Sequence, residues 1–155
     1  MSEIQHGAGE RKGESSAPAI WTAPYSTRSA WRVDITRAGC DRAAKAGKPT
    51  PGEVLAPSAA LVFPTLRALK AASTDAERDS IWMGYRAAYL DEIRARWRGG
   101  RRAEIEALLE RPHVVLVCFC VGASRCHRTI AAEILAKIGA GIGARYHGEI
   151  QPVRP

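Results

Sequence analysis

Residues 114–135, VVLVCFCVGASRCHRTIAAEIL, decide the fold that this sequence predicts. The segment starts with apolar residues, continues through a short polar loop and ends in an amphipathic pattern. Every position from Val114 to Phe119 is apolar, as in an interior parallel strand covered on both faces. The pattern after the loop is that of a helix with one buried stripe. A loop that joins such a strand to a helix N-terminus is where open α/β sheets bind ligands.

The rest of the chain adds alternating strands and helices. A strand is expected over residues 31–36, and residues 39–52 are rich in Gly, Lys and Pro, which predicts a loop. A helix starts at Ser58 and contains Pro64, which should kink or split it. A second helix follows the capping residues 73–75 and has an apolar residue at every fourth position, at Ile81, Tyr85, Tyr89, Ile93 and Trp97. A short helix over 101–110, the strand over 113–120 and a last strand over 145–150 complete the prediction.

Composition limits the classes of function. The chain has 155 residues, enough for one domain with a core, and we expect residues 20–155 to form it after a flexible tail at 1–19. The net charge of +7 favours anionic partners, a nucleotide or nucleic acid. No apolar run approaches membrane-spanning length, and the N-terminus does not resemble a secretory signal. Four cysteines in an unexported chain should be reduced thiols, which predicts a cytoplasmic protein without membrane contact.

The polar loop after the apolar strand has the features of an anion site. Gly122 and Ser124 are small and allow backbone amides to approach a ligand. The unpaired amides and positive end of the next helix favour a phosphate or carboxylate. Arg125 and Arg128 can add charge-assisted contacts. We therefore expect a phosphate-bearing small molecule as the partner.

The positive end of this helix also favours a reactive thiol. Cys120 ends the strand and Cys126 starts the helix, so either is a candidate nucleophile, because a positive helix end lowers the pKa of a thiol. His127 is a candidate general acid or base. Cys118 lies deeper in the strand, where packing is the simplest role. Whether the protein is an enzyme, and with which cofactor, stays open.

The cysteines also suggest two other kinds of site. The pattern C-x-C-x5-C-H offers four metal ligands, but Cys126 and His127 are adjacent and should diverge at a helix start, so no metal is assigned. A cysteine phosphatase loop needs an arginine six positions after the thiolate. Cys126 stands six positions after Cys120, so the register does not match.

The segment Cys118-Phe-Cys120, followed by Cys126-His127-Arg128 after an apolar strand, resembles the domain of unknown function 488 family, and most closely its short phage- or prophage-type members. The resemblance covers about residues 31–150. Its further segments, in order, lie at 34–37, 56–58, Tyr85 with Tyr89 and Arg94, 132–135, 139–140 and 146–149. The extra residues 141–143 depart from the family pattern and resemble a local duplication.

The resemblance implies a compact, Rossmann-like α/β domain with a mostly parallel sheet flanked by helices, and it implies no known reaction. It also implies a spatial arrangement. Asp34, Thr36 and Arg37 end one strand, and the loop at 120–128 follows another. If these strands are parallel neighbours, both segments meet at one edge of the sheet. Ser58, Tyr85 and Arg94 would then join the ligand site from covering helices.

Three hypotheses about function follow. The first is an enzyme, or a degenerate enzyme, that acts on a phosphate-bearing ligand such as a nucleotide. The second is a non-catalytic protein that sequesters such a ligand or binds a host protein. The third is a zinc-supported nucleic-acid module that uses the net positive charge.

Overall fold

The computed structural model describes residues 16–119 and 125–150 of the chain. Residues 1–15 of the tail expected at 1–19 lie outside the described residues, as do the site residues Cys120, Gly122 and Ser124. The strands are β1 (Ala19–Pro24), β2 (Arg32–Asp34), β3 (His113–Cys118) and β4 (Arg145–Glu149). The longer helices are α1 (Arg37–Lys45), α2 (Ala59–Ala71), α3 (Asp75–Arg96), α4 (Arg102–Leu108) and α5 (His127–Ile138). Three short helical turns are η1 (Pro51–Leu55), η2 (Trp97–Arg101) and η3 (Ala140–Ile142).

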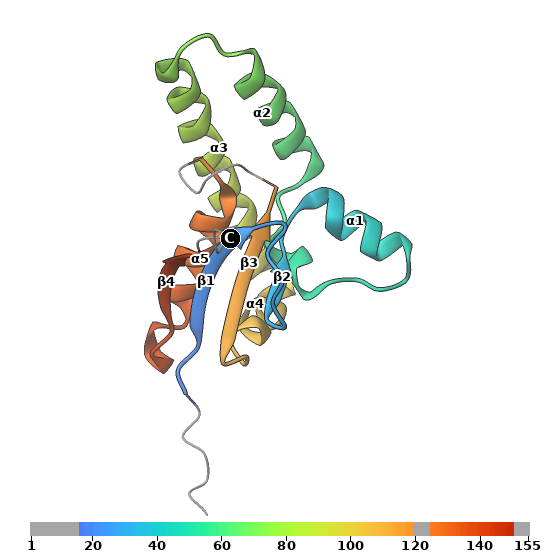
Figure 1. The fold of residues 1–155 in the computed structure, drawn as a ribbon, viewed down its shortest axis with the longest axis vertical. Helices are drawn as coiled ribbons and strands as arrows, with labels where there is room; N and C mark the ends of the chain where they lie inside the picture. The colour runs from blue at the N-terminus through green and yellow to red at the C-terminus, as the bar shows by residue number, and fades with distance from the viewer. Residues whose placement is uncertain (1–15, 120–124, 151–155) are drawn as a thin grey trace, which may run out of the picture.

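The four strands form one parallel sheet in the order β2-β3-β1-β4 (Figure 1). The predicted α/β fold with helices flanking a parallel sheet is therefore confirmed. The apolar strand β3 is interior, between β2 and β1, and its residues from Val114 to Cys118 are all buried. Phe119 departs from the prediction, because 55% of it is exposed just beyond the strand.

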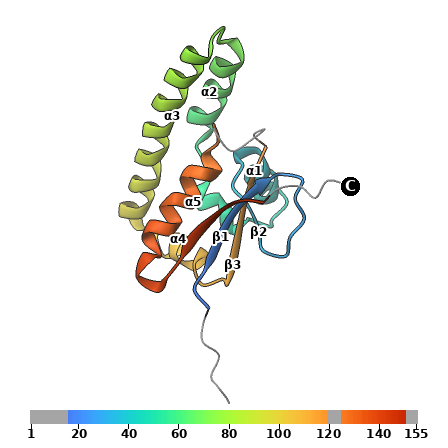
Figure 2. The ribbon, with the colours of Figure 1, turned by 60° about the vertical axis from the view of Figure 1, so that its left-hand side comes forward.

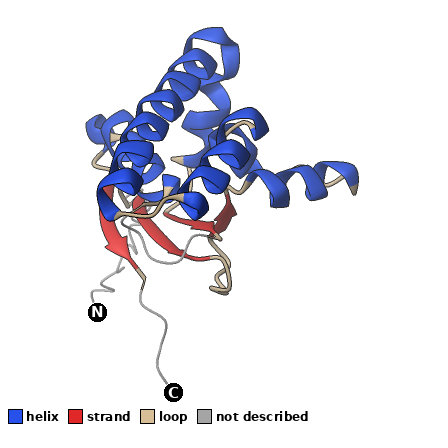
Figure 3. Cartoon of the chain, turned by 90° about the horizontal axis from the view of Figure 1, so that it is seen from above, coloured by secondary structure: helices blue, strands red, loops and turns tan. Residues whose placement is uncertain are grey.

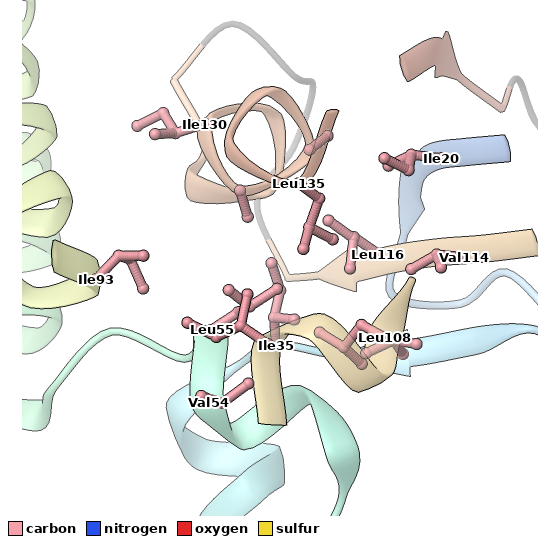
Figure 4. Packing of buried hydrophobic residues seen from close by; sticks show 14 of the residues in the cluster. Ile20, Ile35, Val54, Leu55, Ile93, Leu108, Val114, Leu116, Ile130 and Leu135 are labelled. Atoms are coloured by element: carbon pink, nitrogen blue, oxygen red, sulfur yellow. The ribbon is translucent and has the colours of Figure 1, made fainter. Parts of the chain in front are cut away.

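The main core lies between the sheet and the helices that gather on one side of it (Figure 3). Figure 4 shows Leu135 of α5 and Leu108 of α4 gathered near Leu116 of β3. Because strand side chains alternate, Val115 and Val117 point to the other face, where they join a smaller cluster. The carboxyl ends of the strands remain at the edge from which α1 and α5 start.

The helices α2 and α3 form a hairpin that rises away from the sheet (Figures 1 and 2). The predicted starts are confirmed: Ser58 Oγ accepts from Leu61 N, and Thr74 Oγ1 accepts from Glu77 N. The helix α2 continues through Pro64, so the expected split does not occur. No residue of α2 is buried, which leaves one of its sides facing open space. None of the helices in the described part of the chain is both long and apolar enough to cross a bilayer.

The prediction of a loop over residues 39–52 is right only for residues 46–50. This segment contains most of α1 and the start of η1, and Gly39 and Cys40 are buried. The glycine content suggested a loop, but Gly39 is required by close packing. A Cβ at this position would collide with the side chains of Asp34 and Thr36. The strand β1 was not predicted, because it ends in Pro24 and lacks a regular alternation of polar and apolar residues.

Candidate functional site

The carboxyl ends of β2 and β3 lie side by side. The two strands pair in parallel, with Asp34 opposite Val117, so the segments that follow them leave the sheet at one edge. His127, the first residue of α5, places Nε2 at 2.8 Å from the carbonyl oxygen of Ile35. The expected meeting of the two segments is confirmed, and it brings the starts of α1 and α5 together.

Asp34 and Thr36 build the start of α1. Asp34 Oδ1 accepts hydrogen bonds from Thr36 N at 2.8 Å and from Thr36 Oγ1 at 2.7 Å. Thr36 Oγ1 in turn accepts from Gly39 N at 3.0 Å and caps the helix. The carboxylate of Asp34 therefore stabilises the turn that leads from β2 into α1.

Arg37 is the first residue of α1 and its side chain is only 15% exposed. Its guanidinium pairs with Glu53 at 3.1 Å and with Asp41 at 3.6 Å. The Nε atom is buried and has no hydrogen-bond partner among the described residues. A buried donor of this kind is uncommon in native proteins and points to a missing partner.

A cavity of about 160 Å³ opens beside these residues. Its polar side comes from the starts of α1 and α5, and its apolar side from α2 and the end of β3. The lining residues are Thr36, Arg37, Ala38, Val62, Phe63, Leu66, Phe119 and His127. We call this space the edge cavity.

His127 forms part of the wall of the edge cavity. A carbonyl oxygen only accepts hydrogen bonds, so the contact with Ile35 fixes the proton on Nε2 and leaves a lone pair on Nδ1. Burial lowers the pKa of His127 to about 4, which keeps the ring neutral at pH 7. The ring also meets Tyr89 edge-on, at 5.8 Å between centroids.

Cys118 and Cys126 lie next to His127 with their sulfur atoms in contact. Both residues are buried, at 1% and 0% exposure. The predicted divergence of Cys126 and His127 is wrong, because their ligand atoms and that of Cys118 all lie within 4.8 Å of one another. Cys126 is the extended residue before α5 (φ −143°, ψ 137°), so the rotation between successive helical side chains does not apply to it.

Arg128 points into the protein and is fully buried. Its Nη2 and Nε donate to the carboxylate of Glu149 at 2.7 and 3.2 Å. Its Nη1 donates to the sulfur of Cys118 at 3.1 Å and to that of Cys126 at 3.6 Å. The guanidinium therefore bonds to the two sulfur atoms and to Glu149 of β4. A ligand in the edge cavity cannot reach it.

Three other predicted site residues, Ser58, Tyr85 and Arg125, do not line the edge cavity. Ser58 caps α2 and donates to Glu92, away from the edge cavity. Tyr85 is 5% exposed, stacks on Trp82 at 5.1 Å and lines a small second cavity with Arg125 and His127. Arg125 pairs with Asp79 at 2.7 Å on the surface. Of the predicted ligand residues, the edge cavity thus unites Thr36 and Arg37 with His127.

Sequence reasoning missed two contributions. Glu149, the counter-charge of Arg128, stands 21 residues away in β4, and only the family-like segment at 146–149 drew attention to it. The apolar wall of Phe63 and Leu66 comes from α2, whose exposed side gives no periodic pattern of its own.

Comparison with known proteins places these elements within one family pattern. Residues 25–139 match the family model DUF488-N3a, which is described as the active DUF488-N3 subclade. The match includes β2, β3 and α5, and it ends before β4 and Glu149. No curated protein and no solved structure matched the chain.

Proposed function

The chain belongs to the DUF488 family, in its N3a subclade, and from this premise we propose that it binds a phosphate-bearing small molecule, such as a nucleotide, in the edge cavity. We place it among the short phage- or prophage-type members of the family and in the cytoplasm. Open α/β sheets bind ligands outside the carboxyl ends of their strands, which is where this cavity lies.

The observation that carries the proposal is Arg37, which lines the edge cavity and whose buried Nε has no hydrogen-bond partner among the described residues. A phosphate oxygen would supply the acceptor that this donor lacks. The first turn of α1 adds the positive end of a nine-residue helix on the same side. Both features favour negative charge at one end of the cavity.

The apolar lining of the edge cavity suits a flat apolar group. Phe63 and Leu66 project from α2 and are 39% and 47% exposed, although both are large and apolar. Phe119 lies at the end of β3 and stacks on Tyr25 at 3.8 Å between centroids. Aromatic surfaces of this kind stack with nucleobases regardless of base identity. The proposed ligand therefore combines a phosphate with a ring.

Ligand binding without catalysis is favoured over two alternatives, an enzyme with a cysteine nucleophile and a nucleic-acid-binding module. Cys126 is buried against Cys118 and Arg128, so a substrate cannot reach its sulfur in this arrangement. The basic stretch around residues 94–102 is largely ion-paired with acidic neighbours on the same helices, which is typical of a solvated surface. No observation specifically favours nucleic acid.

Calorimetric titration tests the proposal. We would titrate the protein with nucleoside monophosphates, nucleoside diphosphates and inorganic phosphate. Arg37→Gln should weaken binding of each phosphate-bearing ligand about tenfold or more, which corresponds to one lost charge-assisted contact. Arg42→Gln is the matched control, since Arg42 lies on the same helix outside the cavity. Equal loss in both variants, or no binding by the wild type, would refute the proposal.

A further inference from the structure

We propose that Cys118, Cys126 and His127 bind one divalent metal ion, with zinc as the best match. This inference is independent of the proposed ligand in the edge cavity. The three residues come from the end of β3 and the start of α5, and all three are buried. Two sulfurs and one imidazole nitrogen are the donor atoms that zinc prefers in proteins.

The spacing of the backbone favours a metal over a disulfide. The Cα atoms of Cys118 and Cys126 are 7.9 Å apart. A relaxed disulfide joins Cα atoms that are about 4.4–6.8 Å apart, so a bond here would need a shift of the backbone. Two cysteines that bind one metal ion are not held to this limit on their Cα separation, because no S–S bond joins them. The positions of the chain therefore fit ligands of one centre.

Each proposed ligand also has the outer hydrogen bond that metal sites use. Arg128 Nη1 donates to both sulfurs, an arrangement that suits thiolates better than neutral thiols. His127 donates its Nε2 proton to the carbonyl of Ile35, which leaves the Nδ1 lone pair available to bind the metal. Backbone carbonyls hold ligating histidines in this way in many zinc proteins.

The charges of the buried groups balance around a divalent ion. Arg128 carries one positive charge inside the protein, and Glu149 neutralises it through two hydrogen bonds. Two thiolates would add two negative charges with no other cation in contact among the described residues. An ion of charge +2 cancels them, and buried charge without such compensation is costly.

Three protein ligands leave one position of a tetrahedral ion for water or for a bound molecule. His127 belongs both to this group and to the wall of the edge cavity. The proposed ion would therefore lie next to the cavity.

Metal analysis and cobalt substitution test the inference on the full chain. Protein purified with reductant and without chelators should contain one zinc per chain by elemental analysis. After removal of zinc, Co²⁺ should produce a thiolate-to-cobalt charge-transfer band together with the visible bands of a tetrahedral site. This spectrum requires only the wild-type protein, so it does not depend on whether variants fold. Wild-type protein without the charge-transfer band would overturn the inference.

Variants separate this site from other thiols. Cys126→Ser should abolish the charge-transfer band or reduce its intensity by half, and His127→Gln should weaken zinc binding at least tenfold. Arg128→Lys should weaken it about 10- to 100-fold through the outer shell. Cys40→Ser is the matched control, since Cys40 is a buried free cysteine in α1 and should leave metal binding unchanged. Equal effects of Cys40→Ser and Cys126→Ser would overturn the assignment.

Mass spectrometry examines the competing disulfide. Peptides that contain Cys118 and Cys126 should be alkylated separately after unfolding in a chelator without reductant. A covalently linked pair in freshly prepared, metal-free protein would overturn the inference. Neither outcome affects the calorimetric test of Arg37, so failure of the metal site and failure of the proposed ligand are distinguishable.

Discussion

His127 Nε2 donates to the carbonyl oxygen of Ile35 across 2.8 Å, although 92 residues separate them in the sequence. The bond joins the first residue of α5 to the residue that follows β2. It holds two helix starts at one edge of the sheet, and the edge cavity opens between them. The candidate site is thus a consequence of how β2 and β3 pair.

The pair of Arg128 and Glu149 should be strongly coupled. Glu149→Ala leaves a fully buried guanidinium without its counter-charge, and we expect a loss of about 3–5 kcal/mol in the free energy of unfolding. Arg128→Met should cost less after Glu149 has already been removed, since no unpaired charge then remains inside. Urea unfolding of both single variants and the double variant measures this coupling. Additive effects of the two changes would show that the pair is not a unit.

Glu53 should make stability depend on acidic pH. Burial by itself would raise the pKa of Glu53, but hydrogen bonds from Arg101 and Arg37 outweigh it and hold that pKa below the usual 4.5. The folded state therefore favours the carboxylate. Its contribution is present above pH 4.5 and is lost as the pH falls through the lowered pKa. Urea unfolding between pH 7 and pH 3 should show a smaller loss for Glu53→Gln than for the wild type, and identical profiles would contradict this.

Two glycines should respond in opposite ways to alanine. A Cβ at Gly52 would collide with the backbone carbonyl of Asp34, so Gly52→Ala should destabilise the protein by about 1–3 kcal/mol. Gly84 lies inside α3 with nothing within 4 Å of a Cβ. Gly84→Ala should therefore stabilise the protein by about 0.5–1 kcal/mol, because alanine favours the helix. Thermal unfolding of both variants measures the two signs, and a destabilised Gly84→Ala would contradict the helix assignment.

Phe63 should contribute to binding only when the ligand has a ring. Phe63→Ala removes one stacking surface, so affinity for a nucleoside monophosphate should fall about tenfold, within the usual 1–3 kcal/mol per stacked base. Affinity for ribose 5-phosphate, which has no base, should stay unchanged. Leu69→Ala on the same helix is the control, because Leu69 does not line the edge cavity. Parallel losses for both ligands would argue against stacking.

The sequence predicted most of the helices and the strand pair at the site for physical reasons. The apolar run at β3 permits only an interior strand, and Thr74 with the stripe from Tyr85 to Ile93 defines α3. The segment at 39–52 was misread, because close packing of Gly39 against Asp34 appears only in three dimensions. Nothing in the sequence indicated that Arg128 points into the protein, because its counter-charge Glu149 lies in β4, 21 residues further along the chain.

Amide chemical shifts would reveal whether a phosphate binds at the carboxyl edge of β2 and β3. The protein would be labelled with nitrogen-15 and titrated with inorganic phosphate and then with a nucleoside monophosphate. We expect saturable shifts that are largest at the amides of Thr36, Arg37, Ala38 and His127. Shifts that are spread over the basic helix surface around Arg98, with these four amides unmoved, would contradict it.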